Sequence, residues 1–220
     1  MPGSSSRDLN LWKQHLGHVP DWVWTHAEAE TLVLADNGLT MLSGEVGRMQ
    51  SLRMLDLGHN QLAEVPEELG ALTGLRDFLY LHDNRLSTLP AALERLTRLR
   101  YLNISENAFQ YFPECVCGMA ALMELRATDN QFATLPESVG RLSNLRELHL
   151  RNNQLVTLPA SIGLLQELRQ IDLRGNPLLV LPATLAELPR LEKIDLRWVR
   201  TLEPPAWLAE LEARGCAVYR

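Results

Sequence analysis

Asparagine recurs along this chain at an almost constant interval, at Asn37, Asn60, Asn84, Asn107, Asn130, Asn153 and Asn176. The successive separations are 23, 24, 23, 23, 23 and 23 residues. A fixed period in the range of about 20–50 residues is typical of a solenoid, in which one coil cannot bury its apolar face alone but stacked coils share a core. The spacing therefore predicts a solenoid, an architecture that presents an extended concave binding surface.

Apolar residues and proline occupy fixed positions around each asparagine. Leucine or a substitute stands at −8, −5 and −3, and further apolar residues stand at +2, +5, +9 and +12. Proline stands at +6 in six repeats, as Pro66, Pro90, Pro113, Pro136, Pro159 and Pro182. The −5/−3 alternation predicts a short strand with both side chains inward, and the +9/+12 spacing predicts helical turns such as Glu137–Arg141 and Ala160–Leu164. We expect the asparagine amides to stack as a ladder that satisfies backbone groups.

The unit LxxLxLxxNxLxxLPxxLxxLxx resembles the leucine-rich repeat family. It is most similar to the proline-containing 23-residue subclass, which includes bacterial repeat proteins, plant intracellular Ras-group-related proteins and Shoc2-like scaffolds. The resemblance covers nearly the whole chain. It implies an α/β leucine-rich repeat solenoid, a curved horseshoe with a parallel concave sheet and short helical or 3-10 segments on the convex side.

We expect about eight repeats plus caps. Residues 1–7 are expected to be a flexible N-terminus, 8–28 a degenerate repeat and N-terminal cap, 29–201 the repeats, and 202–220 a C-terminal cap helix and strand. Trp12, Trp22 and Trp24 are expected to cover the open core at the N-terminal end. Ala206–Arg214 is expected to form a helix ended by glycine, with a last strand after it. The array is expected to be complete.

Net charge and cysteine content indicate the cellular compartment and the kinds of partner to expect. A net charge of −6 argues against non-specific binding to nucleic acid or anionic membranes. The chain has neither an apolar run long enough to span a bilayer nor the layout of a signal peptide. Cys115, Cys117 and Cys216 form no terminal disulfide cluster, which fits a reducing compartment, and the first two are expected on the convex side. We expect a cytoplasmic protein of bacterial source, with a secreted effector acting in a host cell as the alternative.

The outward positions at −6, −4, −2 and −1 divide the concave face into two halves. The first four repeats present acids and aromatic residues, and Phe78, Tyr80 and Tyr101 are expected to lie exposed on neighbouring strands, next to His82. Aromatic residues are enriched at the centres of protein–protein interfaces. The alternative is that the rings only cover one another across the strands.

The last four repeats present mixed charge. We expect a second binding zone there, formed by Arg126, His149, Arg151, Arg174, Arg197 and Trp198. Arg151, Arg174 and Arg197 share the −2 position of consecutive repeats and are called the arginine column. Asp172 and Asp195 are expected to neutralise the charge of this column in a solvated lattice of ion pairs. The alternative is a site for an acidic segment of a partner, since arginine recognises carboxylates through two hydrogen bonds.

Two irregularities interrupt the repeat. One extra residue within Arg76–Phe78 predicts a bulge, which either re-aims side chains or is harmless loop variation. Ala127 takes an inward leucine position and leaves room for a bulkier neighbour.

The sequence argues against an enzyme. His59 and His82 could approach Asp36, Asp56 and Asp83 as a metal or acid–base cluster, but these positions face outward on an open sheet. No glycine-rich phosphate loop, nucleophile elbow or zinc-protease motif occurs. We therefore expect no metal and no cofactor.

We predict a non-catalytic, monomeric protein–protein interaction module. The resemblance to Shoc2-like scaffolds implies a small GTPase or a phosphatase complex as the partner. The alternative is a structural protein that self-assembles through its caps or edge strands.

Overall fold

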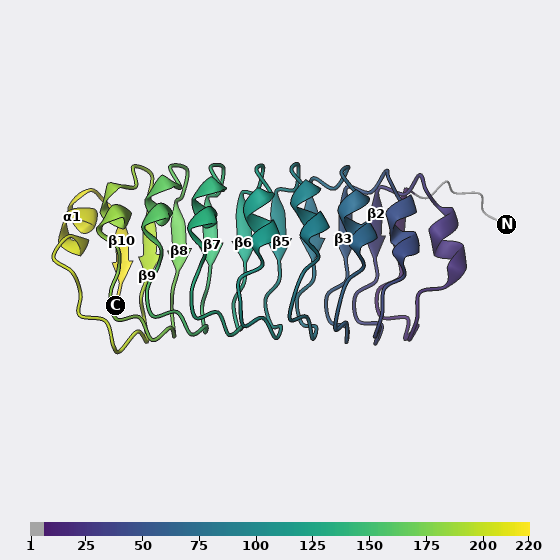
Figure 1. Ribbon diagram of the computed structural model, residues 1–220, viewed down its shortest axis with the longest axis horizontal. Helices are drawn as coiled ribbons and strands as arrows, with labels where there is room; N and C mark the ends of the chain where they lie inside the picture. Colours follow the sequence, from purple (N-terminus) through teal and green to yellow (C-terminus); the bar gives the residue numbers. More distant parts are fainter. Residues whose placement is uncertain (1–6) are drawn as a thin grey trace.

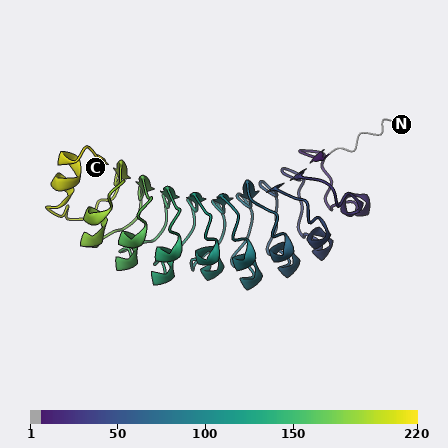
Figure 2. The same cartoon turned by 90° about the horizontal axis from the view of Figure 1, so that it is seen from above.

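The computed structural model describes residues 7–220, so the flexible segment expected over residues 1–7 lies, except for its last residue, outside the described residues. Within them, ten short strands form one parallel sheet in chain order, and each strand pairs with the next. The strands are β1 (Asp8–Asn10), β2 (Thr31–Val33), β3 (Met54–Asp56), β4 (Phe78–Tyr80), β5 (Tyr101–Asn103), β6 (Glu124–Arg126), β7 (Glu147–His149), β8 (Gln170–Asp172), β9 (Lys193–Asp195) and β10 (Ala217–Tyr219). The sheet lines the concave side of a curved solenoid (Figures 1 and 2), which confirms the predicted fold.

Single 3-10 turns cover the convex side of the sheet (Figure 2). They are η1 (Asp21–Thr25), η2 (Gly44–Arg48), η3 (Glu67–Ala71), η4 (Ala91–Arg95), η5 (Glu114–Gly118), η6 (Glu137–Arg141), η7 (Ala160–Leu164) and η8 (Ala183–Glu187). Proline precedes seven of these turns. It suits this position because its ring fixes φ and it has no N–H that would be left unpaired. Before η2, Ser43 takes this place, and its hydroxyl accepts the N–H of Glu45.

The inward leucines form one continuous core along the solenoid. The central residue of each inner strand is fully or almost fully buried, as Leu55, Leu102 and Ile171 illustrate. Burying each such side chain contributes about 1.5–3 kcal/mol, but only when neighbouring coils cover it. Ala127 is buried in this core as well, and Phe109 and Phe132 stack within it with ring centroids 6.2 Å apart.

The repeated asparagines form a ladder that joins successive coils. Asn60 Oδ1 accepts the backbone N–H groups of Asn37 and Leu39 from the preceding coil, at 3.1 and 3.0 Å. Its Nδ2 donates to the carbonyl oxygens of Leu34 in that coil and Leu57 in its own. All seven asparagines make the equivalent pair of bonds to the preceding coil. Each rung therefore satisfies backbone groups that strand pairing leaves open.

The residue before each asparagine adopts a left-handed conformation. Asp36, His59, Asp83 and Asn152 have φ between 50° and 57°, and Gly175 occupies the same position with φ of 69°. Glycine and short polar residues tolerate this region, whereas it costs most L-residues about 1–2 kcal/mol. This residue turns the chain out of the strand and into the ladder.

The two ends of the solenoid are built differently. At the N-terminal end, Trp24 is buried, but Trp12 and Trp22 are 59% and 48% exposed. The prediction that all three tryptophans cover the core is therefore wrong, because Val23 and Trp24 already fill the inward positions of η1. At the C-terminal end, α1 (Leu208–Ala213) is followed by Gly215 with φ of 90° and then by β10. No helix among residues 7–220 is long and apolar enough to cross a bilayer.

The extra residue of the third coil lies before the strand and does not disturb its pairing. The N–H groups of Arg76 and Asp77 both donate to the carbonyl oxygen of Arg53. Phe78 then pairs with Met54 in the common register of the sheet. The extra residue is thus accommodated in the loop that enters β4.

Candidate interaction face

Strand register aligns the outward side chains of the concave face into columns. Residues in register on parallel neighbours lie side by side, about 4.8 Å apart. The first column contains Thr31, Met54, Phe78, Tyr101, Glu124, Glu147, Gln170 and Lys193, and the second contains Val33, Asp56, Tyr80, Asn103, Arg126, His149, Asp172 and Asp195. The character of the face therefore changes along the solenoid, from aromatic at β4 and β5 to charged from β6 onward.

An aromatic cluster, defined here as Phe78, Tyr80 and Tyr101, occupies β4 and β5. The ring centroids lie 5.8 Å apart for Phe78–Tyr80, 5.5 Å for Phe78–Tyr101 and 5.1 Å for Tyr80–Tyr101. Phe78 is 41% exposed, whereas both tyrosines are less exposed than this because the three rings cover one another. Burial raises the pKa of Tyr101 to about 12 and raises the pKa of Tyr80. The cluster thus offers one open phenyl ring supported by two packed rings.

A pair of histidines continues this cluster towards the asparagine turns. The His82 ring contacts the Tyr80 ring at 5.9 Å between centroids and lies over Gly58, where an added Cβ would be 2.4 Å from His82 Cε1. His82 Nε2 lies 3.2 Å from His59 Nε2, and His59 Nδ1 lies 2.7 Å from Asp83 Oδ2. Burial lowers the pKa of His82, and the neighbouring His59 lowers it further.

The carboxylates expected around these histidines are only partly brought together. Asp83 pairs with His59, but Asp56 accepts the backbone N–H of Gly58, and Asp36 pairs with Lys13 at 3.2 Å. An open hollow of about 540 Å³ lies beside His59, next to Asp36 and Asp83. The arrangement is a set of exposed ion pairs and does not enclose a reacting group.

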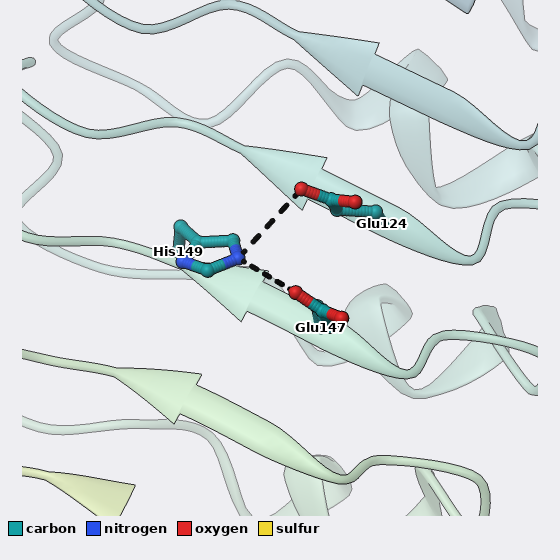
Figure 3. Close-up of side chains that lie close together, drawn as sticks. All are labelled: Glu124, Glu147 and His149. Carbon is teal, nitrogen blue, oxygen red and sulfur yellow. Dashed lines mark hydrogen bonds and ion pairs between the residues drawn. The ribbon is translucent and has the colours of Figure 1, made fainter.

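Glu124, Glu147 and His149 converge at the centre of the sheet. Figure 3 shows one ring nitrogen of His149 facing both carboxylates. His149 Nε2 lies 3.3 Å from Glu147 Oε2 and 3.9 Å from Glu124 Oε1. Arg126 Nε donates to Glu124 Oε1 at 2.6 Å, and the Cζ atom of Arg126 lies 6.0 Å from the centre of the Tyr101 ring. Sequence reasoning placed Arg126 and His149 on this face but assigned no role to the two glutamates that they contact.

The arginine column is neutralised by buried or half-buried carboxylates. Arg197 donates to both carboxylate oxygens of Asp195, and Arg174 makes the same fork with Asp172. Asp195 is only 1% exposed, and Arg174 also lies 3.6 Å from it. Burial opposes ionisation of Asp195, but hydrogen bonds from Arg197 outweigh it and hold its pKa below the ordinary value. The pairs are those expected for Arg174 and Arg197, but the expected solvated lattice is not found here, because Asp195 is buried.

Arg151 is neutralised by a different carboxylate. It donates to Asp129 Oδ2 at 3.0 Å, and Asn152 donates to Asp129 Oδ1 at 2.7 Å. Asp129 follows the strand of the preceding coil, so this pair crosses between coils. Arginines on this face are therefore paired, and they can still present their guanidinium edges to a partner.

Trp198 ends the charged zone at the C-terminal end of the sheet. It is 62% exposed and lies within 6 Å of the guanidinium groups of Arg174 and Arg197, at 5.8 and 5.9 Å. Beside it, a cavity of about 300 Å³ is lined by apolar side chains such as Leu202 and by Arg220. This end combines an exposed ring, two cations and an apolar hollow.

The cysteines lie away from the concave face. Cys115 and Cys117 belong to η5 on the convex side, as expected, but both side chains are buried there, and Cys216 is also buried. Burial raises the pKa of the Cys115 thiol to about 11 and raises the pKa of Cys117 and Cys216. We therefore expect these thiols to react slowly in the folded protein.

Comparison with known proteins identifies the repeat. The family model for the leucine rich repeat matches residues 27–86, 77–132, 121–178 and 143–198. A probable disease resistance protein of Arabidopsis thaliana is 39% identical over 105 residues, which cover 46% of this chain and 10% of that protein. The chain thus spans about a tenth of the length of that curated relative.

Solved structures share most of the solenoid. A leucine-rich repeat protein of Leptospira interrogans superimposes with a TM-score of 0.74 at 26% identity, over 94% of this chain and 64% of that one. The ectodomain of the plant receptor kinase GASSHO1/SCHENGEN3 from Arabidopsis thaliana, solved in complex with CASPARIAN STRIP INTEGRITY FACTOR 2, gives 0.76 at 30% identity, over 92% of this chain and 25% of that one.

Proposed function

Because this chain belongs to the leucine-rich repeat family, whose repeats typically serve as protein-interaction modules, we propose that it is a non-catalytic module that binds a protein partner on its concave face. The observation that carries the proposal is the aromatic cluster, in which Phe78 is exposed at the surface of the sheet. Large aromatic residues in pre-packed surroundings are favoured as binding anchors because little side-chain entropy is lost on binding.

The charged zone supplies the second part of the proposed interface. It comprises Arg126, His149, Arg151, Arg174, Arg197 and Trp198. The guanidinium groups are held by carboxylates on the same face, so they are oriented before a partner arrives. Such pairs contribute specificity and association rate more than affinity.

The finer assignments are part of the same proposal. The spacing supports the proline-containing 23-residue subclass, and with it a bacterial source and a partner such as a small GTPase or a phosphatase complex. Free, buried cysteines support a reducing compartment, either the cytoplasm of the source cell or the host cell that an effector would enter. The form proposed for this module is a monomer.

Affinity capture from lysates tests the proposed site. The triple variant Phe78→Ala, Tyr80→Ala and Tyr101→Ala should lose the partner that the wild-type protein captures, with a purified binding measurement to follow. The matched control is Tyr111→Ala with Leu164→Ala, which removes exposed apolar side chains that are not on the concave strands. Equal capture by the wild-type protein and the triple variant, with both folded, would show that the cluster is not the site.

One observation favours self-association as a second candidate function. Trp12, which follows the edge strand β1, and Trp22, which belongs to η1, are both exposed in the N-terminal coil. Exposed edges and large apolar side chains are routes to assembly. Sedimentation of the wild-type protein beside Trp12→Ala with Trp22→Ala separates the two functions, because only self-association predicts a concentration-dependent oligomer that this variant abolishes.

A further inference from the structure

We propose that Glu124, Glu147 and His149 bind a divalent transition-metal ion of the Zn²⁺ class at the centre of the concave face. The three donors come from two neighbouring strands, β6 and β7, and their ligand atoms lie within 4.8 Å of one another (Figure 3). This site lies one strand beyond the aromatic cluster, because Tyr101 pairs in register with Glu124.

The distances between the donors fit a shared metal ion. Two ligands on a tetrahedral zinc ion, with bonds of about 2.0–2.1 Å, are separated by about 3.3–3.4 Å. The separation between His149 Nε2 and Glu147 Oε2 is 3.3 Å, and that between His149 Nε2 and Glu124 Oε1 is 3.9 Å. The first of these separations already matches that value, the second has to shorten, and all the ligand atoms lie within 4.8 Å of one another.

Charge at this point of the sheet also favours a cation. Glu124 and Glu147 stand directly opposite each other in register, an arrangement that is destabilising for like charges. Arg126 supplies one positive charge through its bond to Glu124 Oε1, which leaves an excess of one negative charge when His149 is neutral. A carboxylate offers about four lone-pair sites, so the bond from Arg126 orients Glu124 without using up its capacity as a ligand.

The donor set selects the kind of ion. One imidazole nitrogen with two carboxylates suits zinc and related transition metals better than magnesium or calcium, which prefer oxygen ligands alone. Three protein ligands leave a fourth tetrahedral position for water or for a carboxylate or imidazole of a partner.

Preorganisation distinguishes this site from the histidine pair near the turns. The side chains of Glu124, Glu147 and His149 are 24%, 37% and 20% exposed and stand on paired strands. His59, by contrast, is 53% exposed, and it lies on a left-handed turn where it is already paired with Asp83. Sites built on strands hold their ligands more precisely than sites on loops.

Calorimetric titration of metal-free protein, freed of any affinity tag, with ZnCl₂ tests the proposal. We expect one ion per chain in the wild-type protein. His149→Ala and Glu147→Gln should each weaken binding by at least about tenfold, since even the groups that support a metal ligand are worth that much. His82→Ala is the matched control and should keep wild-type affinity. Equal far-UV circular dichroism and equal melting without metal establish that each variant is folded.

Binding of Co²⁺ gives a second measurement, the visible absorption spectrum, which a change in protein stability alone would not alter. Co²⁺ bound to the wild-type protein should show the visible absorption of a tetrahedral site, and His149→Ala should abolish it. Unchanged zinc affinity in His149→Ala, loss of binding in His82→Ala, or magnesium binding as tight as zinc binding would each overturn the assignment. Because the probe is the metal alone, failure of this test leaves the proposed protein partner untouched.

Discussion

Replacing one rung of the asparagine ladder should destabilise the whole solenoid measurably. Asn130 is buried, its Nδ2 donates to the carbonyl oxygens of Ile104 and Thr128 at 3.0 and 3.1 Å, and its Oδ1 accepts the N–H of Phe109 at 3.3 Å. Asn130→Ala leaves the buried N–H of Phe109 without its acceptor and removes a donor from two carbonyl groups. A buried group left unpaired costs about 1–3 kcal/mol, so we expect a loss of about 2 kcal/mol.

Urea denaturation, followed by circular dichroism, measures this loss of unfolding free energy as a shift in the midpoint urea concentration. With an m-value of about 3 kcal/mol/M, a loss of about 2 kcal/mol lowers the midpoint by about 0.7 M. Asn144→Ala is the matched control, since Asn144 makes a single exposed bond to the carbonyl oxygen of Ala120. A surface change of this kind should stay within about 0.5 kcal/mol.

Comparing the urea midpoints of Asn130→Ala and Asn144→Ala tests whether the ladder stabilises the fold. Coil-to-coil coupling should make the effect of Asn130→Ala global, because each repeat of a solenoid is stabilised by its neighbours. If the midpoint for Asn130→Ala matched that of the wild-type protein, or fell no further than that for Asn144→Ala, the ladder would not stabilise the fold at this rung.

Three other predictions concern buried charge, buried sulfur and the left-handed turn. Asp195→Asn should cost about 1–3 kcal/mol at pH 7, because it removes the charge of a buried carboxylate that accepts two hydrogen bonds from the half-exposed Arg197. Since the folded pKa of Asp195 is lowered, its stabilisation is present above the unfolded value near 3.9 and is lost as the pH falls through the folded value, so melting temperatures of the variant should vary less with pH below about 4. Cys115 should react slowly with iodoacetamide in the native protein and rapidly in urea, as followed by mass spectrometry, and fast native labelling would contradict its burial. Gly175→Ala should lower the urea midpoint by the equivalent of about 1–2 kcal/mol, because φ is 69° there and the new Cβ would lie 2.3 Å from Asn152 Oδ1; an unchanged midpoint would show that the turn relaxes freely.

The fold could be predicted because the inward positions carry the same apolar residue types in each repeat. A leucine or isoleucine at the centre of each strand, such as Leu55 above Leu32, meets a similar neighbour in the adjacent coil, so one residue pattern specifies every coil at once. The left-handed residue before each asparagine could have been recognised from the frequent Asp, Asn, His and Gly at that position, a composition typical of φ above zero. Sequence analysis treated this position only as an outward one.

The concave face was harder to predict because contacts between its side chains depend on rotamers and on cross-strand register. Phe78 is open while Tyr80 is half-buried, although both are outward residues of the same strand. The convergence of Glu124 with His149 becomes visible only when β6 and β7 are aligned in register. Sequence periodicity predicts which residues lie on the concave face, but strand register and side-chain rotamers determine which of them are in contact.

Trp198 shows where the repeat departs from what folding alone requires. It occupies the left-handed position with φ of 65°, where a bulky residue costs about 1–2 kcal/mol, and it is still 62% exposed. Burial therefore does not offset the strain, and its two contacts with Arg174 and Arg197 are of the exposed kind, worth about 0.5–1 kcal/mol each. Those contacts bring the balance to about zero, so Trp198 adds little or nothing to the stability of the free protein. Strain that persists at an exposed aromatic residue supports a role in binding, because the ring gains its stabilisation only when a partner covers it.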